Sequence, residues 1–301
     1  MKDFTLVILA AGMGSRYGGT KQLDAITENG ETIMDFSLYD AIKAGFTKIV
    51  FIVRKDILEE VKTDFGAKLK GKVEVEYAIQ ETTKVPEKYS NNQRLKPWGT
   101  AHALLVAKDL IKDNFCVINA DDFYGYDAYK KIISFLKNAD PSSTNYTMVG
   151  YPIYNTLSEN GSVSRGETFA DEDNNLQQIK ERTAITKRGN DIVFENEDGK
   201  EEIMSKDTIV SMNFFGFTPA FLNYLDSEFE AFLEENYQEL KAEFFLPLVV
   251  DNLIKANEAK MKVLSTDAKW IGVTYKEDKE VVVNKVKTLM QQAVYPPKLW
   301  E

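Results

Sequence analysis

Glycines and two cations crowd into one short stretch near the start of the chain, AAGMGSRYGGTKQL at residues 10–23. The apolar run FTLVIL precedes this stretch directly, so we expect the stretch to be a loop at the end of a buried strand. Glycine backbone N–H groups can face an anion with no side chain in between, and Arg16 and Lys21 would add positive charge. This composition indicates a phosphate-binding loop.

Three glycine-rich patterns bind phosphate, and they differ in the residues that follow the glycines. A P-loop requires Ser or Thr directly after its Lys, whereas Gln22 follows Lys21. A dinucleotide fingerprint requires an acidic residue after the second strand, whereas Arg54 follows KIVFIV. The third pattern, G-x-G-[ST]-R followed shortly by Lys, fits Gly12, Gly14, Ser15, Arg16 and Lys21. A purely structural turn is the alternative.

A pair of carboxylates follows another apolar run, FCVINA, at Asp121 and Asp122. Because the pair follows a strand, we interpret it as a metal-binding site. The alternative is that these aspartates cap a helix or form a turn. Mg²⁺ takes carboxylate oxygens together with phosphate oxygens and waters, so one or two aspartates suffice.

The elements that must position these residues alternate between strands and helices over the first half of the chain. The predicted elements, strand and helix in turn, cover residues 4–10, 32–45, 48–53, 57–65, 72–79, 99–111, 115–120, 126–138 and 147–153. This rhythm predicts an α/β fold with a doubly wound, mainly parallel, Rossmann-like sheet, whose ligands lie at the carboxyl ends of the strands.

The rhythm changes after residue 162, where strands joined by turns such as EDGK predict an antiparallel subregion. The predicted strands cover 163–169, 176–185, 191–203, 208–217, 261–265 and 269–275, and the helices cover 219–236, 247–259 and 276–292. We expect one domain over 1–301, with a nucleotide-binding part at 1–150 and an acceptor-binding part at 151–301.

Composition excludes several classes of function. The 301 residues carry 37 Lys and Arg against 47 Asp and Glu, a net charge of −10, so we expect no nucleic-acid partner and no membrane surface. One cysteine excludes an intramolecular disulfide, and one histidine, His102, excludes a multi-histidine metal site. FTLVILA is too short to span a membrane and no cleavage pattern follows it, so the expected location is cytoplasmic.

The opening loop resembles the signature loop of the nucleotidyltransferase family that joins nucleoside triphosphates to sugar 1-phosphates, which has a GT-A-like fold. The resemblance implies that the loop wraps the triphosphate, that Arg16 and Lys21 are catalytic cations, and that pyrophosphate leaves. The implied nucleotide contacts in this loop are Ala10, Ala11, Gly12, Gly14 and Ser15.

Further motifs extend the resemblance. IQE at 79–81 and GTAHAL at 99–104 are similar to the base-recognition segment of N-acetylglucosamine-1-phosphate uridyltransferases, which implies that Gln80, Gly99 and Thr100 bind the nucleoside. VINADD is similar to the family's strand ending in a metal-binding aspartate, which makes Asp121 a catalytic Mg²⁺ ligand. Residues 87–98 form a longer spacer than the family carries, either a lid or a surface loop.

The acceptor side resembles the family more loosely. NGSVSRG, IKER and SMNFFGF imply sugar contacts at Gly161, Glu181 and Asn213. Thr274 stands where the family places its second metal ligand, and Asp278, four residues later, is the candidate for that role.

The predicted function is the Mg²⁺-dependent transfer of a nucleotidyl group to a phosphorylated sugar, giving an NDP-sugar and pyrophosphate. UTP or dTTP is favoured because a glutamine amide offers one donor and one acceptor to N3–H and O4, and a flipped amide could also read CTP. Two alternatives stay open: a non-sugar phosphorylated acceptor, such as an alditol phosphate, phosphocholine or a cofactor, or a non-catalytic nucleotide-sensing protein. The oligomeric state is undetermined.

Overall fold

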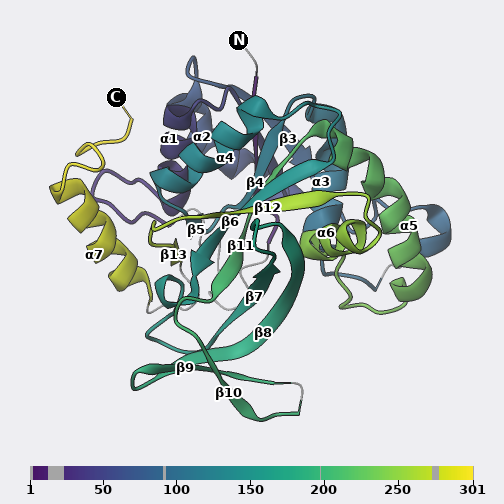
Figure 1. Ribbon diagram of the computed structural model, residues 1–301. Coiled ribbons are helices and arrows are strands. Elements are labelled where there is room, and N and C mark those ends of the chain that lie inside the picture. The colour runs from purple at the N-terminus through teal and green to yellow at the C-terminus, as the bar shows by residue number, and fades with distance from the viewer. Residues whose placement is uncertain (1–2, 13–23, 91–92, 197, 273–277, 301) are drawn as a thin grey trace.

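The protein folds around one large sheet in a computed structural model that describes residues 3–12, 24–90, 93–196, 198–272 and 278–300 (Figure 1). The centre of the sheet is parallel: β1 (Thr5–Leu9) lies between β2 (Lys48–Val53) and β4 (Phe115–Asn119). β3 (Glu74–Ile79) continues the parallel order beyond β2. These strands match the predicted ones closely.

The antiparallel part joins this centre through β11 (Ile209–Phe217), which pairs with β4 at one end and diverges at the other. At that other end β11 pairs with β7 (Val163–Ala170), while β6 (Asn145–Pro152) pairs with β11 near both of its ends. β12 (Lys260–Ser265) runs parallel to β6. The predicted fold class, a mainly parallel sheet with an antiparallel subregion, is confirmed.

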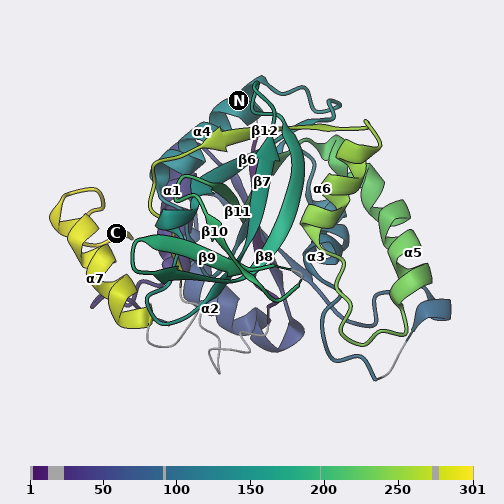
Figure 2. The same cartoon turned by 60° about the horizontal axis from the view of Figure 1, so that its bottom comes forward.

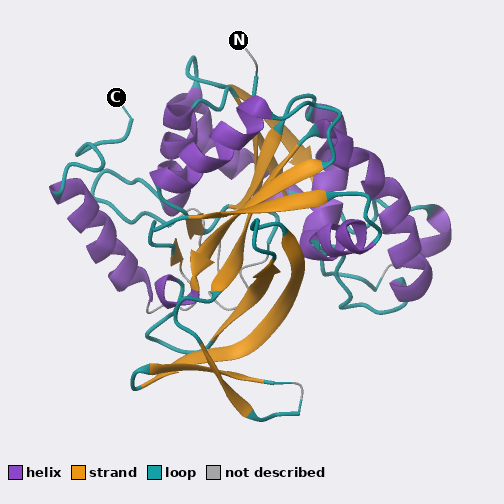
Figure 3. Cartoon of the chain, viewed as in Figure 1, coloured by secondary structure: helices purple, strands orange, loops and turns teal. Residues whose placement is uncertain are grey.

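A meander carries the sheet away from the helices, as Figure 3 shows. It follows β7 through β8 (Leu176–Arg188), β9 (Asp191–Glu195) and β10 (Glu201–Met204). One further pair of very short strands, β5 (Asp122–Phe123) and β13 (Ile271–Gly272), lies outside the large sheet and brings distant segments of the chain together.

Helices cover both faces of the parallel centre, and the side-chain alternation of β1 explains why. Leu6 and Ile8 belong to one buried apolar cluster and Val7 belongs to the other, because successive residues of a strand point to opposite faces. The first cluster includes side chains of α1 (Ile33–Ala44), α2 (Leu58–Leu69), α4 (Tyr126–Asn138) and α7 (Asp278–Gln291). The second includes side chains of α3 (Thr100–Ala107), α5 (Leu225–Asn236) and α6 (Leu246–Lys255) (Figure 2).

Local signals set the ends of α1. Thr32 and Asp35 form a capping box at its start, and Gly45 ends it in the left-handed conformation with φ of 114°. The helix predicted to end at Gly45 is thus confirmed. Among the described residues, no helix is both long enough and apolar enough to cross a bilayer.

The C-terminal segment is held against α1 by buried hydrogen bonds. The hydroxyl of Tyr295 donates to Asp40 Oδ2 at 2.6 Å, and Trp300 Nε1 donates to Asp35 Oδ1 at 2.6 Å. Burial raises the pKa of Asp40 to about 7, although the hydrogen bond from Tyr295 and the charge of Lys43 oppose this rise. Asp40 therefore holds its proton more tightly in the folded chain than in the unfolded chain.

We expect Asp40→Asn to remove a pH dependence of stability. In the wild type, proton binding by this carboxyl stabilises the folded chain fully below pH 3.8, the ordinary pKa of Asp. This contribution to the free energy of unfolding is lost as the pH rises to about 7, the pKa in the folded chain. The shift corresponds to roughly 4 kcal/mol. Urea unfolding of both proteins between pH 4 and pH 8 measures the effect. The variant should gain stability relative to the wild type as the pH rises, and parallel stability curves would refute the role of Asp40.

Candidate functional site

A cavity of about 250 Å³ lies at the carboxyl ends of β1, β3 and β4, where the alternation of strands and helices predicts ligands. We call it the strand-end cavity. It is lined by six of the predicted residues: Ala11, Gly12, Gln80, Gly99, Thr100 and Asp121. Ala10 is buried, and its N–H donates to the carbonyl of Ile52. The other predicted loop residues, Gly14, Ser15, Arg16 and Lys21, lie outside the described residues.

Gly12 lines the cavity as the last described residue of the glycine-rich loop. Its carbonyl accepts a hydrogen bond of 3.2 Å from Arg54 Nη1, which holds the start of the loop near the end of β2. A Cβ atom built on Gly12 meets no atom of the described chain within 4 Å. No described atom therefore limits the size of a side chain at position 12.

We expect Gly12→Ala to weaken nucleotide binding at least about tenfold, a loss of 1.4 kcal/mol, and to leave the fold intact. The added methyl group meets no described protein atom, but if the loop wraps a triphosphate as predicted, the methyl group would keep the phosphates away from the backbone. Titration calorimetry with each nucleoside triphosphate measures binding, and thermal unfolding measures stability. Unchanged affinity in the folded variant would remove Gly12 from the proposed phosphate loop.

Another part of the cavity wall is built from the residue after β3 and from the residues at the start of α3. The Gln80 N–H continues the sheet by donating to the carbonyl of Val53 at 2.9 Å. Its side-chain Nε2 donates to the carbonyl of Gly99 at 3.0 Å and lies 3.1 Å from Nδ1 of His102. These contacts bring together two segments that the sequence separates by the spacer 87–98.

Gly99 has a conformation that glycine alone adopts readily, with φ of 106° and ψ of −177°. A Cβ atom at this position would lie 2.5 Å from the carbonyl oxygen of Phe244. The close approach allows two backbone hydrogen bonds. The Phe244 N–H donates to the carbonyl of Trp98, and the Phe244 carbonyl accepts from the N–H of Ala101. The connection between α5 and α6 is thus joined to the backbone on either side of Gly99.

The spacer is packed against the same connection rather than lying loosely on the surface. Arg94 is buried, its guanidinium lies 3.5 Å from the ring centre of Trp98, and it donates to the carbonyl of Glu239 at 3.0 Å. The indole of Trp98 donates to the carbonyl of Thr82 at 2.9 Å. The segment was predicted to be either a lid or a surface loop; its described residues are packed as part of the cavity wall, and neither prediction is confirmed.

The sequence analysis did not predict an ion pair that is formed by two residues lining the cavity. Lys96 and Glu243 both line the cavity, and Lys96 Nζ lies 2.5 Å from the Glu243 carboxylate. No local pattern links the two positions, because only the packing of the spacer against the α5–α6 connection brings them together. Asn119 also lines the cavity, and its place at the end of a strand, two residues before Asp121, could have indicated this.

The two adjacent carboxylates have different environments. Asp121 lines the cavity, whereas Asp122 is buried and accepts hydrogen bonds from Asn119 Nδ2 at 2.9 Å and from the hydroxyl of Tyr124 at 3.2 Å. Asp121 lies in the turn after β4, whereas Asp122 is the first residue of β5, so the two side chains have different surroundings. Asp121 is therefore the one of the pair that is placed to meet a ligand in this cavity.

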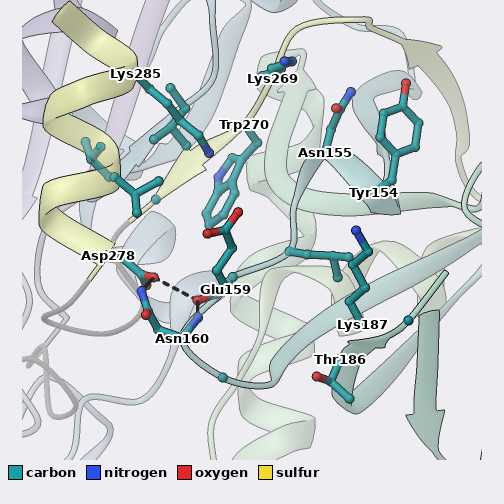
Figure 4. Close-up of a pocket in the computed structure, with 18 residues that line it drawn as sticks. Tyr154, Asn155, Glu159, Asn160, Thr186, Lys187, Lys269, Trp270, Asp278 and Lys285 are labelled. Atoms are coloured by element: carbon teal, nitrogen blue, oxygen red, sulfur yellow. Dashed lines mark hydrogen bonds between the residues drawn. The ribbon is translucent and has the colours of Figure 1, made fainter. Parts of the chain in front are cut away.

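A second, larger cavity of about 900 Å³ contains two more predicted residues, Gly161 and Asp278 (Figure 4). Asp278 is buried at the start of α7, where its Oδ1 accepts from Ser158 Oγ and Asn160 Nδ2, both at 2.8 Å. Thr274, which stands at the family's position for the second ligand, lies outside the described residues.

The pair of short strands relates the two cavities. Asp122 of β5 pairs with Gly272 of β13, and Gly272 lines the second cavity. Asp121, one residue away from Asp122, lines the strand-end cavity. The Asp121–Asp122 segment therefore lines the strand-end cavity at Asp121 and pairs, at Asp122, with a strand that lines the second cavity.

Arg165 lies among carboxylates that the sequence places far apart. Burial lowers the pKa of Arg165 to about 10, while the charges of Asp122, Glu181 and Asp278 favour its charged form. Its guanidinium lies 4.7 Å from the ring centre of Trp270, a residue that lines the second cavity. Burial also raises the pKa of Glu181, an effect that the charge of Arg165 opposes.

The register of the antiparallel strands places the two remaining predicted residues. Gly166 of β7 pairs with Glu181 of β8 on one side and with Ser211 of β11 on the other. Asn213 follows Ser211 at an irregularity of β11, with φ of 58°, and its N–H donates to Ser211 Oγ at 3.3 Å. Glu181 and Asn213 thus belong to the strands flanking Gly166, one residue after Arg165.

Comparisons with known proteins give one family and one fold. Residues 5–273 match the model of the family described as nucleotidyl transferase. No curated protein matches the chain. A solved structure assigned as a glucose-1-phosphate thymidylyltransferase from Bacillus anthracis, in complex with sucrose, is similar with a TM-score of 0.65 at 13% identity, over 94% of each chain. The inositol-1-phosphate CTP transferase from T. maritima is similar with a TM-score of 0.58 at 12% identity, over 95% of this chain and 96% of that one.

Proposed function

Since this chain belongs to the nucleotidyl transferase family and is a nucleotidyltransferase, we propose that it joins a nucleoside triphosphate to a sugar 1-phosphate, with Mg²⁺, to give an NDP-sugar and pyrophosphate. The observation that carries the proposal is the strand-end cavity, where six residues predicted to bind nucleotide or metal converge. The two similar structures bear names that refer to glucose 1-phosphate and inositol 1-phosphate, which supports a phosphorylated polyol as acceptor.

The reaction needs no protein nucleophile. An oxygen of the acceptor's phosphate attacks the α-phosphorus in line, a new P–O bond forms, and the bond to the β-phosphate breaks as pyrophosphate leaves with the electron pair. The acceptor phosphate is already anionic and nucleophilic, so catalysis consists of positioning and neutralisation of charge. We assign the neutralising charges to Arg16 on the departing phosphates and to Lys21 on the α-phosphate.

The residues around Asp121 suit Mg²⁺. A carboxylate at the cavity wall is the hard oxygen ligand that Mg²⁺ prefers, and phosphates and waters complete its shell, so no cluster of three protein ligands is required. No such cluster of three occurs among the described residues. When bound, Mg²⁺ would neutralise charge on the phosphate oxygens. Asp278 is the proposed second ligand, because it is the carboxylate that follows the position where the family places this ligand.

The second cavity is the proposed site of the acceptor. Gly161 lies in its wall, and Lys187, Lys269 and Lys285 come to it from three different segments (Figure 4). The cavity is lined by these three lysines and by two carboxylates, Glu159 and Asp278, so its lining carries a small positive excess in a chain with a net charge of −10, which favours an acceptor carrying phosphate.

Pyrophosphate release tests the proposal directly. The purified chain is mixed with MgCl₂, one of UTP, dTTP, CTP, ATP or GTP, and one acceptor: glucose 1-phosphate, inositol 1-phosphate, phosphocholine or an alditol phosphate. We expect release only when both substrates are present, with UTP or dTTP and a sugar 1-phosphate giving the highest rate. Unphosphorylated glucose is the matched control. Nucleotide binding without release for any acceptor would favour the sensing alternative.

A further inference from the structure

The amide group of Gln80 is held in one orientation by two hydrogen-bond acceptors. Its Nε2 lies 3.0 Å from the carbonyl oxygen of Gly99 and 3.1 Å from Nδ1 of His102. An amide NH₂ has two hydrogens, so these two contacts use both. If the amide flipped, its oxygen would face the carbonyl oxygen of Gly99, and a donor would be lost at both positions. The side chain is therefore fixed provided that Nδ1 of His102 is an acceptor.

The contact of the other ring nitrogen, Nε2, shows that Nδ1 of His102 is an acceptor. Nε2 lies 3.2 Å from the carbonyl oxygen of Lys84, and a carbonyl oxygen can only accept, so Nε2 carries the hydrogen. His102 is completely buried, and burial lowers its pKa to about 4, so the ring is neutral at physiological pH. A neutral ring with its hydrogen on Nε2 has a lone pair on Nδ1.

One polar atom of Gln80 is left for a ligand. No described residue donates a hydrogen bond to Oε1, and Gln80 lines the strand-end cavity. A base in this cavity would thus meet a fixed acceptor instead of the paired donor and acceptor that the sequence suggested. Uracil and thymine present an N–H donor at N3. Cytosine presents a lone pair at N3, which would face the lone pairs of Oε1.

We infer that His102 is a positioning residue, which fixes Gln80 with its oxygen toward the base and so makes the cavity select uracil or thymine over cytosine. The inference rests on the proposed function, because it assumes that a nucleobase occupies this cavity. It deepens that function by excluding CTP as a comparable substrate, and it assigns a role to the single histidine of the chain.

The tautomer of His102 is measurable without any substrate. Labelling with ¹⁵N-histidine gives one spin system because the chain has a single histidine, so no assignment is needed. We expect the Nε2–H tautomer, with no protonation of the ring above about pH 5. An Nδ1–H tautomer, or titration near the ordinary histidine pKa of 6.5, would overturn the inference whether or not the protein binds nucleotide.

Selectivity is measured by calorimetric titration of UTP and CTP with MgCl₂ present. We expect the wild type to bind UTP at least about tenfold more tightly than CTP, because a wrong hydrogen-bond partner costs about 1.4 kcal/mol or more. His102→Phe fills the same space without the Nδ1 acceptor, and it should reduce this ratio about threefold or more. An unchanged ratio in the folded variant would overturn the inference.

Phe229→Leu is the matched control, because the ring of Phe229 lies 4.9 Å from that of His102 and the change disturbs packing but no hydrogen bond of Gln80. It should keep the ratio of the wild type, and a loss as large as that of His102→Phe would attribute the effect to packing and contradict the inference. If neither triphosphate binds, the proposed function and the selectivity both fail. The tautomer experiment then still decides whether His102 holds Gln80.

Discussion

Asp121→Asn is expected to lower the rate of pyrophosphate release at least about a hundredfold, which corresponds to roughly 2.7 kcal/mol of activation free energy. The substitution keeps the shape of the side chain and removes the charge that Mg²⁺ would meet at the wall of the strand-end cavity. Asp121 does not belong to the buried core, so the free energy of unfolding should change little. Initial rates at saturating substrates and urea unfolding measure the two quantities.

Two further variants make this result interpretable. Asp191→Asn removes a carboxylate that is exposed at the β8–β9 turn, and it should leave the rate unchanged. Asp122→Asn changes a buried carboxylate that accepts from Asn119 and Tyr124, so it should reduce stability more and the rate less than Asp121→Asn does. Near-normal turnover in the Asp121 variant would exclude Asp121 as the essential ligand.

Gly99→Ala is expected to weaken nucleotide binding at least about a hundredfold. It should also destabilise the protein by several kcal/mol. The backbone conformation of Gly99, with φ of 106° and ψ of −177°, costs any other residue of order 1–3 kcal/mol. The new Cβ would also lie 2.5 Å from the carbonyl oxygen and 2.8 Å from the nitrogen of Phe244. Backbone atoms cannot rotate away, so the cavity wall must shift.

Gly45→Ala is the control for the cost of a positive φ without a steric clash. Gly45 also has a positive φ, 114°, but a Cβ there meets only the end of Lys137 at 3.9 Å. This variant should lose about 1–2 kcal/mol of stability and keep the nucleotide affinity of the wild type. Calorimetric binding and thermal unfolding of both variants give the comparison. Equal losses in the two variants would mean that contact with Phe244 is irrelevant to the site.

The sequence predicted the fold well because the parallel strands are short, apolar runs with clear boundaries. β2 and α4 begin and end where the pattern places them, and α1 ends at its glycine. Apolar runs buried on both faces, helical periodicity and capping residues are local signals, which one stretch of chain carries by itself. The branching of the sheet at β11 has no such signal, since three pairing partners come from different parts of the chain.

Part of the site could also be predicted from the sequence. The ends of β1, β3 and β4 supply Gly12, Gln80 and Asp121, and the order of strands in a parallel sheet brings such ends to one edge. The predicted contacts at Gly14, Ser15, Arg16 and Lys21 stay predictions, as do the roles of the acceptor residues.

By itself, the sequence determined which residue types stand at the strand ends, and thereby the class of chemistry, because spacing along one strand and its following loop is a property of the local chain. Only the tertiary structure decided how those residues are constrained. The contacts of Lys96 with Glu243 and of Gly99 with Phe244 join positions about 145 residues apart. The orientation of Gln80 depends on a ring and a carbonyl from another element. Such constraints arise from the close packing of separate segments, which no local pattern encodes.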